Sequence, residues 1–274
     1  MTDLLRNLFS YAFINRALIV GMLVALCAAL LGVSLVLKRY SMIGDGLSHV
    51  GFGALSLAMA LGVTPLAVSV PVVVIAAFLL LRISESSKIK GDAAIALIAS
   101  SSLAVGVIIT SLTTGMNTDV YGYMFGSILA MSKVDVVLSA ILSIVVLILF
   151  VFFYNKIFAV TFDERFAKAT GTNAGIYNML IAFLTAITIV VGMRIMGAML
   201  ISSLIIFPAL TSMRVCRSFK GVVITSAIVS VLCFFLGMVA SFAFATPAGA
   251  SIVVVNILAF GIFAGVGWLQ AHTA

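Results

Sequence analysis

Long apolar runs alternate with short polar segments along almost the whole chain. A helix needs roughly 20 apolar residues to cross the hydrocarbon core of a bilayer. Nine runs are close to this length: 17–37, 44–62, 64–82, 92–112, 134–154, 174–192, 195–213, 221–244 and 251–270. Because several of them are near the lower limit, we predict eight or nine spans. A further apolar stretch, 119–131, is too short to span and fits a re-entrant helix buried in protein.

The composition excludes most classes of soluble protein. Of the 274 residues, 64% are hydrophobic and 8% are charged, whereas soluble domains carry about 25% charged residues. A soluble enzyme, a disordered chain and a nucleic-acid-binding module are therefore excluded as descriptions of the whole chain. This much apolar surface has to face lipid. The sequence predicts an all-α, polytopic transmembrane helical bundle, with residues 1–274 forming a single domain.

The net charge of +7 reports the topology of the chain in the membrane. Lysine and arginine concentrate in four short segments between apolar runs: 38–39, 82–90, 156–168 and 214–220. Loops rich in these residues stay on the cytoplasmic side. Placing all four inside makes the crossings alternate, with the N-terminus outside and the C-terminus inside. Because topology accounts for the basic excess, we expect no nucleic-acid partner.

Asp45 and His49 are an ionisable pair at the start of an apolar run. Their i, i+4 spacing places the carboxylate and the imidazole on one face of a helix. Ionisable groups at membrane depth are costly and usually mark an ion or proton path. Imidazole with carboxylate suits zinc, manganese or iron(II). The alternative is a mutual hydrogen bond that pins the helix. Two side chains also make an incomplete metal shell, which a second copy, another helix or water has to complete.

The polar segment after residue 155 contains a short amphipathic pattern. Thr161 and Glu164 match a capping box. Phe162 and Phe166 then share one helical face, and Gly171 is a natural stop. We predict a short cytoplasmic helix, near 161–171, that either lies on the membrane surface or docks into the groove of a partner. The chain has no G-x-x-x-x-G-K-[ST] motif, so it does not bind ATP through a P-loop.

Several blocks of the sequence, in this order, resemble one family of transporters. The most specific is LLGVSLVLKRYSMIGDGLSHVGFGALSLA, with its Asp-x-x-x-His core. The others are DVYGYMFGSILAMSKVD, FDERFAKATG, GAMLISSLIIFPALTS and ATPAGASIVV. Together they resemble the zinc/manganese permease family of ATP-binding cassette (ABC) importers over nearly the whole chain. Gly46 and Val50 stand where this family commonly has alanine, a change small enough to leave the metal assignment intact.

The resemblance implies a multi-pass permease subunit in a prokaryotic inner or plasma membrane, which is not itself an enzyme. It implies two separate ATPase subunits that hydrolyse ATP, an extracytoplasmic metal-binding protein, and a second permease, identical or a close paralogue. We expect the chain to bind no cofactor of its own and to transport its ion by alternating access. Because imidazole with carboxylate accepts either metal, we expect zinc first and manganese second. By this resemblance, Asp45 and His49 are expected to contact the metal ion. The residues that dock on the ATPase become Phe162, Asp163, Glu164, Arg165, Phe166 and Gly171.

Two other classes of function fit the residues alone. In a proton-coupled secondary carrier, Asp45 and His49 form a proton relay and no ATPase takes part. In a non-transporting membrane scaffold, the pair is purely structural. Neither class accounts for the docking-like helix near 161–171 together with the metal-ligand chemistry of the pair.

Overall fold

The computed structural model describes residues 12–86, 91–113, 133–198 and 200–273, and all secondary structure in these ranges is helical. This confirms the all-α prediction, while the predicted re-entrant segment 119–131 lies outside the described residues. The helices are α2 (Ala12–Leu37), α3 (Ile43–Ala60), α4 (Pro65–Ser86), α5 (Gly91–Leu112), α7 (Lys133–Phe152), α8 (Tyr154–Phe162), α9 (Glu164–Ala169), α10 (Ala174–Met196), α11 (Ile201–Met213), α12 (Phe219–Phe244) and α13 (Ala248–Thr273).

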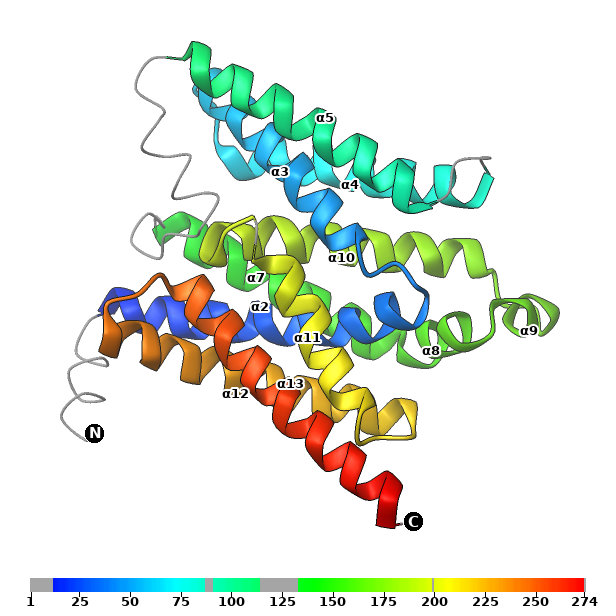
Figure 1. The fold of residues 1–274 in the computed structure, drawn as a ribbon. Helices are drawn as coiled ribbons and strands as arrows, with labels where there is room; N and C mark the ends of the chain where they lie inside the picture. Colours follow the sequence, from blue (N-terminus) through cyan, green and yellow to red (C-terminus); the bar gives the residue numbers. More distant parts are fainter. Residues whose placement is uncertain (1–11, 87–90, 114–132, 199, 274) are drawn as a thin grey trace.

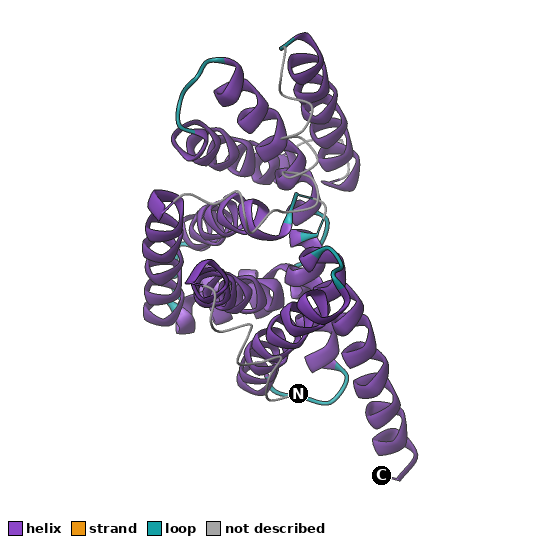
Figure 2. Ribbon diagram, turned by 90° about the vertical axis from the view of Figure 1, so that its left-hand side faces the viewer, coloured by secondary structure: helices purple, strands orange, loops and turns teal. Residues whose placement is uncertain are grey.

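The long helices lie side by side in one bundle (Figure 1). α3, α4 and α5 form a group at one edge, and the view turned by 90° shows the same group at the top (Figure 2). α2 runs through the middle and contacts α7, α10, α11 and α12. α2 and α10 are the most deeply buried of the apolar helices, whereas α13 lies at the rim with most of its surface open. The group of α3, α4 and α5 joins the centre mainly through α10.

Seven of the helices are long and apolar enough to cross a membrane, so the predicted eight or nine spans are not confirmed. Of the nine predicted runs, the two without such a helix are those that correspond to α3 and α11. α3 carries Asp45 and His49, which lower its apolar character. α11 has 13 residues, about 20 Å at the helical rise, against a hydrocarbon core of about 30 Å. The predicted run 195–213 starts too early because Gly197, at φ +94°, ends α10.

Three of the basic segments meet at one end of the bundle, at the right in Figure 1. Lys38, after α2, lies 3.4 Å from the carboxylate of Glu164 in α9. The ring of Phe158 in α8 lies 4.8 Å from that of Phe219, where α12 begins. The start of α2 and the end of α13 lie at opposite ends of the bundle. These positions agree with the predicted alternation of the crossings, which places the basic segments on one membrane face.

Glycines let α3 lie unusually close to its neighbours. A Cβ added to Gly46 would lie 2.6 Å from the side chain of Ile95, and one added to Gly53 would lie 2.8 Å from the backbone oxygen of Ser102, both in α5. A Cβ on Gly51 would lie 2.5 Å from a methionine of α10. Without a hydrophobic driving force between helices in lipid, this close contact is a main source of their association.

We expect Gly53→Ala to lower the melting temperature of the purified protein in detergent. The neighbour of the new methyl group is backbone, which cannot swing aside, and overpacking of this kind costs about 1–3 kcal/mol. Gly261→Ala is the matched control, because a Cβ there meets nothing within 4 Å. The control is expected to melt at or slightly above the wild-type temperature, since alanine favours a helix. Equal melting of the two variants would contradict the packing of α3 on α5.

Candidate functional site

Asp45 and His49 lie one turn apart at the start of α3. The distance from His49 Nε2 to Asp45 Oδ2 is 3.8 Å, and the side chains are 17% and 38% exposed respectively. This distance is longer than an N–H···O hydrogen bond. Two ligand atoms that each lie about 2.1 Å from one zinc ion are at most about 4.2 Å apart. The separation is therefore compatible with both side chains binding a single ion.

The pair opens into a groove between α3 and α5 with a volume of about 250 Å³. The groove is lined by Met42, Asp45, His49, Ile95, Ala96, Ala99, Ser100 and Leu103. Within the described ranges, no group of three or more His, Cys, Asp and Glu side chains comes close enough to hold a metal ion. The described part of this chain thus offers two strong ligands, and the rest of a coordination shell has to come from weaker donors, water or another chain.

Packing on both sides of α3 holds the pair at the edge of this groove. On the side of α5, Gly46 allows the backbone of α3 to approach Ile95. On the side of α11, a Cβ on Gly44 would lie 3.3 Å from Ile205. Within α3, Ser48 Oγ donates a 2.8 Å hydrogen bond to the backbone oxygen of Asp45. The carboxylate is therefore left facing the groove from a helix whose position is closely determined.

The predicted docking helix is α9, and it begins later than the capping box implied. α8 ends at Phe162, and Asp163 then adopts an extended backbone conformation. The Asp163 side chain accepts a 2.9 Å hydrogen bond from the backbone N–H of Phe166, so Asp163 is the N-cap. The predicted cap at Thr161 is wrong, because Thr161 is buried in the last turn of α8. Gly171, at φ +81°, follows α9.

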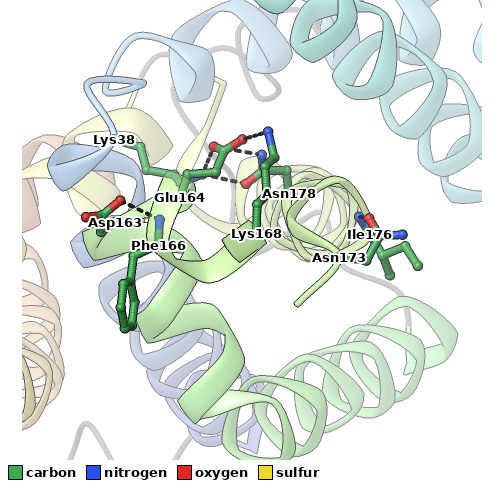
Figure 3. Close-up of polar contacts among 8 residues, drawn as sticks. All are labelled: Lys38, Asp163, Glu164, Phe166, Lys168, Asn173, Ile176 and Asn178. Carbon is green, nitrogen blue, oxygen red and sulfur yellow. Dashed lines mark hydrogen bonds and ion pairs between the residues drawn. The ribbon is translucent and has the colours of Figure 1, made fainter. Parts of the chain in front are cut away.

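The residues predicted to dock do not all face the same way. Phe162 and Phe166 are exposed aromatic side chains, and Arg165 is exposed beside them. Glu164 turns instead toward the bundle (Figure 3). The predicted apolar face of Phe162 and Phe166 is therefore present on the surface. Glu164 does not share that face and contacts the bundle instead.

Glu164 joins α9 to the ends of α2 and α10. Its carboxylate lies 2.8 Å from Lys168 Nζ and 3.4 Å from Lys38 Nζ, and it accepts a 3.2 Å hydrogen bond from Asn178 Nδ2. The Lys38 ammonium, whose side chain is 9% exposed, also donates to Asn178 Oδ1. We call Lys38, Glu164, Lys168 and Asn178 the Glu164 cluster (Figure 3).

The Glu164 cluster keeps its carboxylate ionised. The pKa of Glu164 is lowered from 4.5 to about 2, mainly by the hydrogen bond with Lys168. Burial raises this pKa, whereas the hydrogen bond from Asn178 and the charge of Lys38 lower it further. Because the pKa is lower in the folded protein, the cluster contributes stability above pH 4.5 and loses it as the pH falls toward 2. At neutral pH the negative charge is fully present beside the buried Lys38.

Sequence reasoning missed a second ion pair, at the other end of the bundle. Arg194, at the end of α10, donates a 2.5 Å hydrogen bond to Asp135 in the first turn of α7. Both side chains are largely buried. The signal in the sequence was an acidic residue opening one apolar run and a basic residue closing another, both on the predicted outer side.

The blocks around Asp45 and α9 match a known family. The family model described as the ABC 3 transport family matches residues 10–265. The chain belongs to the ABC 3 transport family. This membership confirms the predicted relationship, and together with the seven apolar helices it confirms the prediction of a multi-pass protein of the cell membrane.

Relatives within the ABC 3 transport family match over nearly their full length. The manganese import system permease protein ScaB of Streptococcus gordonii is 29% identical over 258 residues, covering 94% of this chain and 92% of that protein. The high-affinity zinc uptake system membrane protein ZnuB of Haemophilus influenzae is 30% identical over 244 residues, covering 89% and 94%. The solved structure of PsaBC from Streptococcus pneumoniae in complex with Fab matches with a TM-score of 0.86 at 29% identity, covering 96% of this chain and 94% of the matched chain.

We expect Glu164→Ala to loosen α9 from the bundle. The change leaves the buried Lys38 without its carboxylate partner, and losing a partner of a buried polar group costs about 1–3 kcal/mol. Hydrogen–deuterium exchange of the α9 amides should become faster. Arg165→Ala is the control, because Arg165 is an exposed residue of the same helix and is not part of the Glu164 cluster. If both variants exchange at the wild-type rate, the Glu164 cluster does not hold α9.

Proposed function

We propose that this chain is the membrane-spanning permease subunit of an ABC importer for divalent transition metal ions, with residues 1–274 forming one permease domain. The observation that carries the proposal is the Asp45–His49 pair, set 3.8 Å apart at the edge of the groove between α3 and α5. Its support is membership of the ABC 3 transport family, in which relatives are named for manganese import and for zinc uptake.

Asp45 and His49 are the proposed contacts for the transported ion. An imidazole nitrogen and a carboxylate oxygen are common ligands of zinc and are also accepted by manganese, whereas magnesium and calcium prefer oxygen ligands alone. We therefore propose zinc as the first cargo and manganese as the second. With the basic segments inside, the pair lies toward the cytoplasmic end of α3, where it acts as a late contact on the path of the ion.

The segment that carries α9 is the proposed contact with a separate ATPase subunit. The exposed rings of Phe162 and Phe166 offer an apolar anchor for a groove in that partner. ATP is bound and hydrolysed there, so this chain is a transporter subunit and not an enzyme. The full set of proposed docking residues is Phe162, Asp163, Glu164, Arg165, Phe166 and Gly171. Among these, Glu164 acts indirectly, because it holds α9 to the bundle through Lys38.

We infer a mechanical route between this segment and the proposed metal pair. Glu164 contacts Lys38 at the end of α2, and α3 begins soon after, at Ile43. A movement of α9 driven by the ATPase is thus passed to the turn that precedes Asp45. In the proposed mechanism of alternating access, this movement opens the bundle inward and outward in turn around the level of the pair.

Two further partners complete the proposed importer. A second permease, identical or a close paralogue, lines the pathway opposite this chain and supplies part of the missing coordination shell. An extracytoplasmic metal-binding protein delivers the ion to the outer face. The proton-coupled carrier needs neither an ATPase nor the exposed aromatic face of α9, and no observation favours it.

We expect Asp45→Ala and His49→Ala to abolish ATP-dependent uptake of zinc and manganese. The test uses the permease co-purified with its ATPase, reconstituted in liposomes and supplied with the metal-binding protein. His272→Ala is the matched control, because it removes the only other histidine, an exposed one near the C-terminus. Uptake that needs no ATP would support the secondary carrier. Normal uptake by both site variants, with assembly intact, would mean that the pair is structural.

We expect Phe162→Ser with Phe166→Ser to reduce co-purification of the ATPase by about tenfold or more, since buried aromatic anchors at interfaces commonly contribute 2 kcal/mol or more. Phe244→Ser is the control, because Phe244 is 77% exposed, close to the 75% of Phe162, and lies in α12 at the opposite end of the bundle. Unchanged co-purification of the double variant would overturn the docking assignment.

A further inference from the structure

The groove beside Asp45 and His49 holds one further polar side chain among its lining residues, Ser100 of α5. The other lining residues are aliphatic except for Met42. A thioether is a soft ligand that suits copper(I) better than manganese or zinc. Within the groove, the hydroxyl of Ser100 is therefore the remaining donor of the kind that these two ions accept.

The hydroxyl of Ser100 differs from those of Ser101 and Ser56, which bond to the helix backbone. Ser101 donates to the backbone oxygen of Leu97 at 2.7 Å, and Ser56 donates to that of Phe52 at 3.0 Å. Such bonds to the preceding turn are the usual way for serine to satisfy its hydroxyl where water is absent. Ser100 makes no hydrogen bond to any other described residue. Ser100 is an exposed residue that lines the groove together with Asp45 and His49.

Close packing on both sides of Ser100 holds its helix against α3. Gly46 meets Ile95 and Gly53 meets the backbone of Ser102, so these contacts bracket the metal pair on α3 and Ser100 on α5. Each contact is possible only because glycine has no Cβ. If the two helices separated, both contacts would be lost. The serine is thus carried by a rigid neighbour of α3, and its place beside the pair is part of the packing.

We infer that Ser100 supplies a third, oxygen ligand to the transported ion and so determines how well the site accepts manganese relative to zinc. The inference rests on the proposed function of Asp45 and His49. Manganese favours additional oxygen ligands, whereas zinc is satisfied by four ligands that include nitrogen. A neutral hydroxyl also adds no charge, so it extends the shell without holding the ion too tightly to be released.

The experiment compares initial uptake rates of manganese and zinc by the reconstituted transporter over a range of concentrations of each metal. Ser100→Ala is expected to raise the half-saturating concentration of manganese about tenfold, the lower end of what a lost supporting group costs at a metal site, and to change that of zinc much less. Ser100→Cys, which offers a thiolate, is expected to shift the preference toward zinc. Ser101→Ala is the matched control and should leave both metals unchanged.

The outcomes separate this inference from the proposed function. If Ser100→Ala keeps the wild-type ratio of manganese to zinc, or lowers uptake of both metals equally, the inference is overturned. The proposed function would still stand in that case, provided that Asp45→Ala abolishes uptake in the same assay. If Asp45→Ala transports normally, the proposed function itself fails, whatever the behaviour of Ser100.

Discussion

The close approach of α3 to its neighbours is the constraint on which the rest of the candidate site depends. In lipid, helices associate through van der Waals contact and interhelical hydrogen bonds, and the glycines of α3 provide such contact on three sides, toward α5, α10 and α11. The same close approach lines up Asp45 and His49 with the groove and brings α5 beside them. Larger side chains at Gly46 or Gly53 would separate the two walls of that groove.

A second set of contacts joins α9, in the proposed docking segment, to the same part of the fold. Lys38 is an expensive residue to bury, and Glu164 compensates its charge while Asn178 accepts a hydrogen bond from it. Breaking such a pair costs more than forming it gains, so the cluster specifies a geometry more than it adds stability. Because Lys38 directly precedes the turn into α3, that geometry links α9 to the helix of the metal pair.

The sequence predicted the features that depend on local pattern. Spacing alone placed Asp45 and His49 on one helical face, and charge alone grouped the basic segments now found at one end of the bundle. It missed features that depend on partners distant in the chain. Arg194 and Asp135 lie 59 residues apart, and nothing local pairs them. Two local signals were also assigned wrongly: the cap lies at Asp163 and not at Thr161, and Gly197 ends α10 inside the predicted run 195–213.

The incomplete ligand set is what an importer requires of its pathway. A closed shell of four strong ligands gives a structural site that holds zinc permanently, whereas conduction needs binding that is favourable enough to enter and weak enough to leave. In the proposed site, Asp45 and His49 are two strong ligands at the edge of an open groove, and the Asp45 side chain is 38% exposed. The remaining positions fall to weak or movable donors. Weak donors exchange readily with water, so in the proposed site the ion leaves without the dismantling of a closed shell.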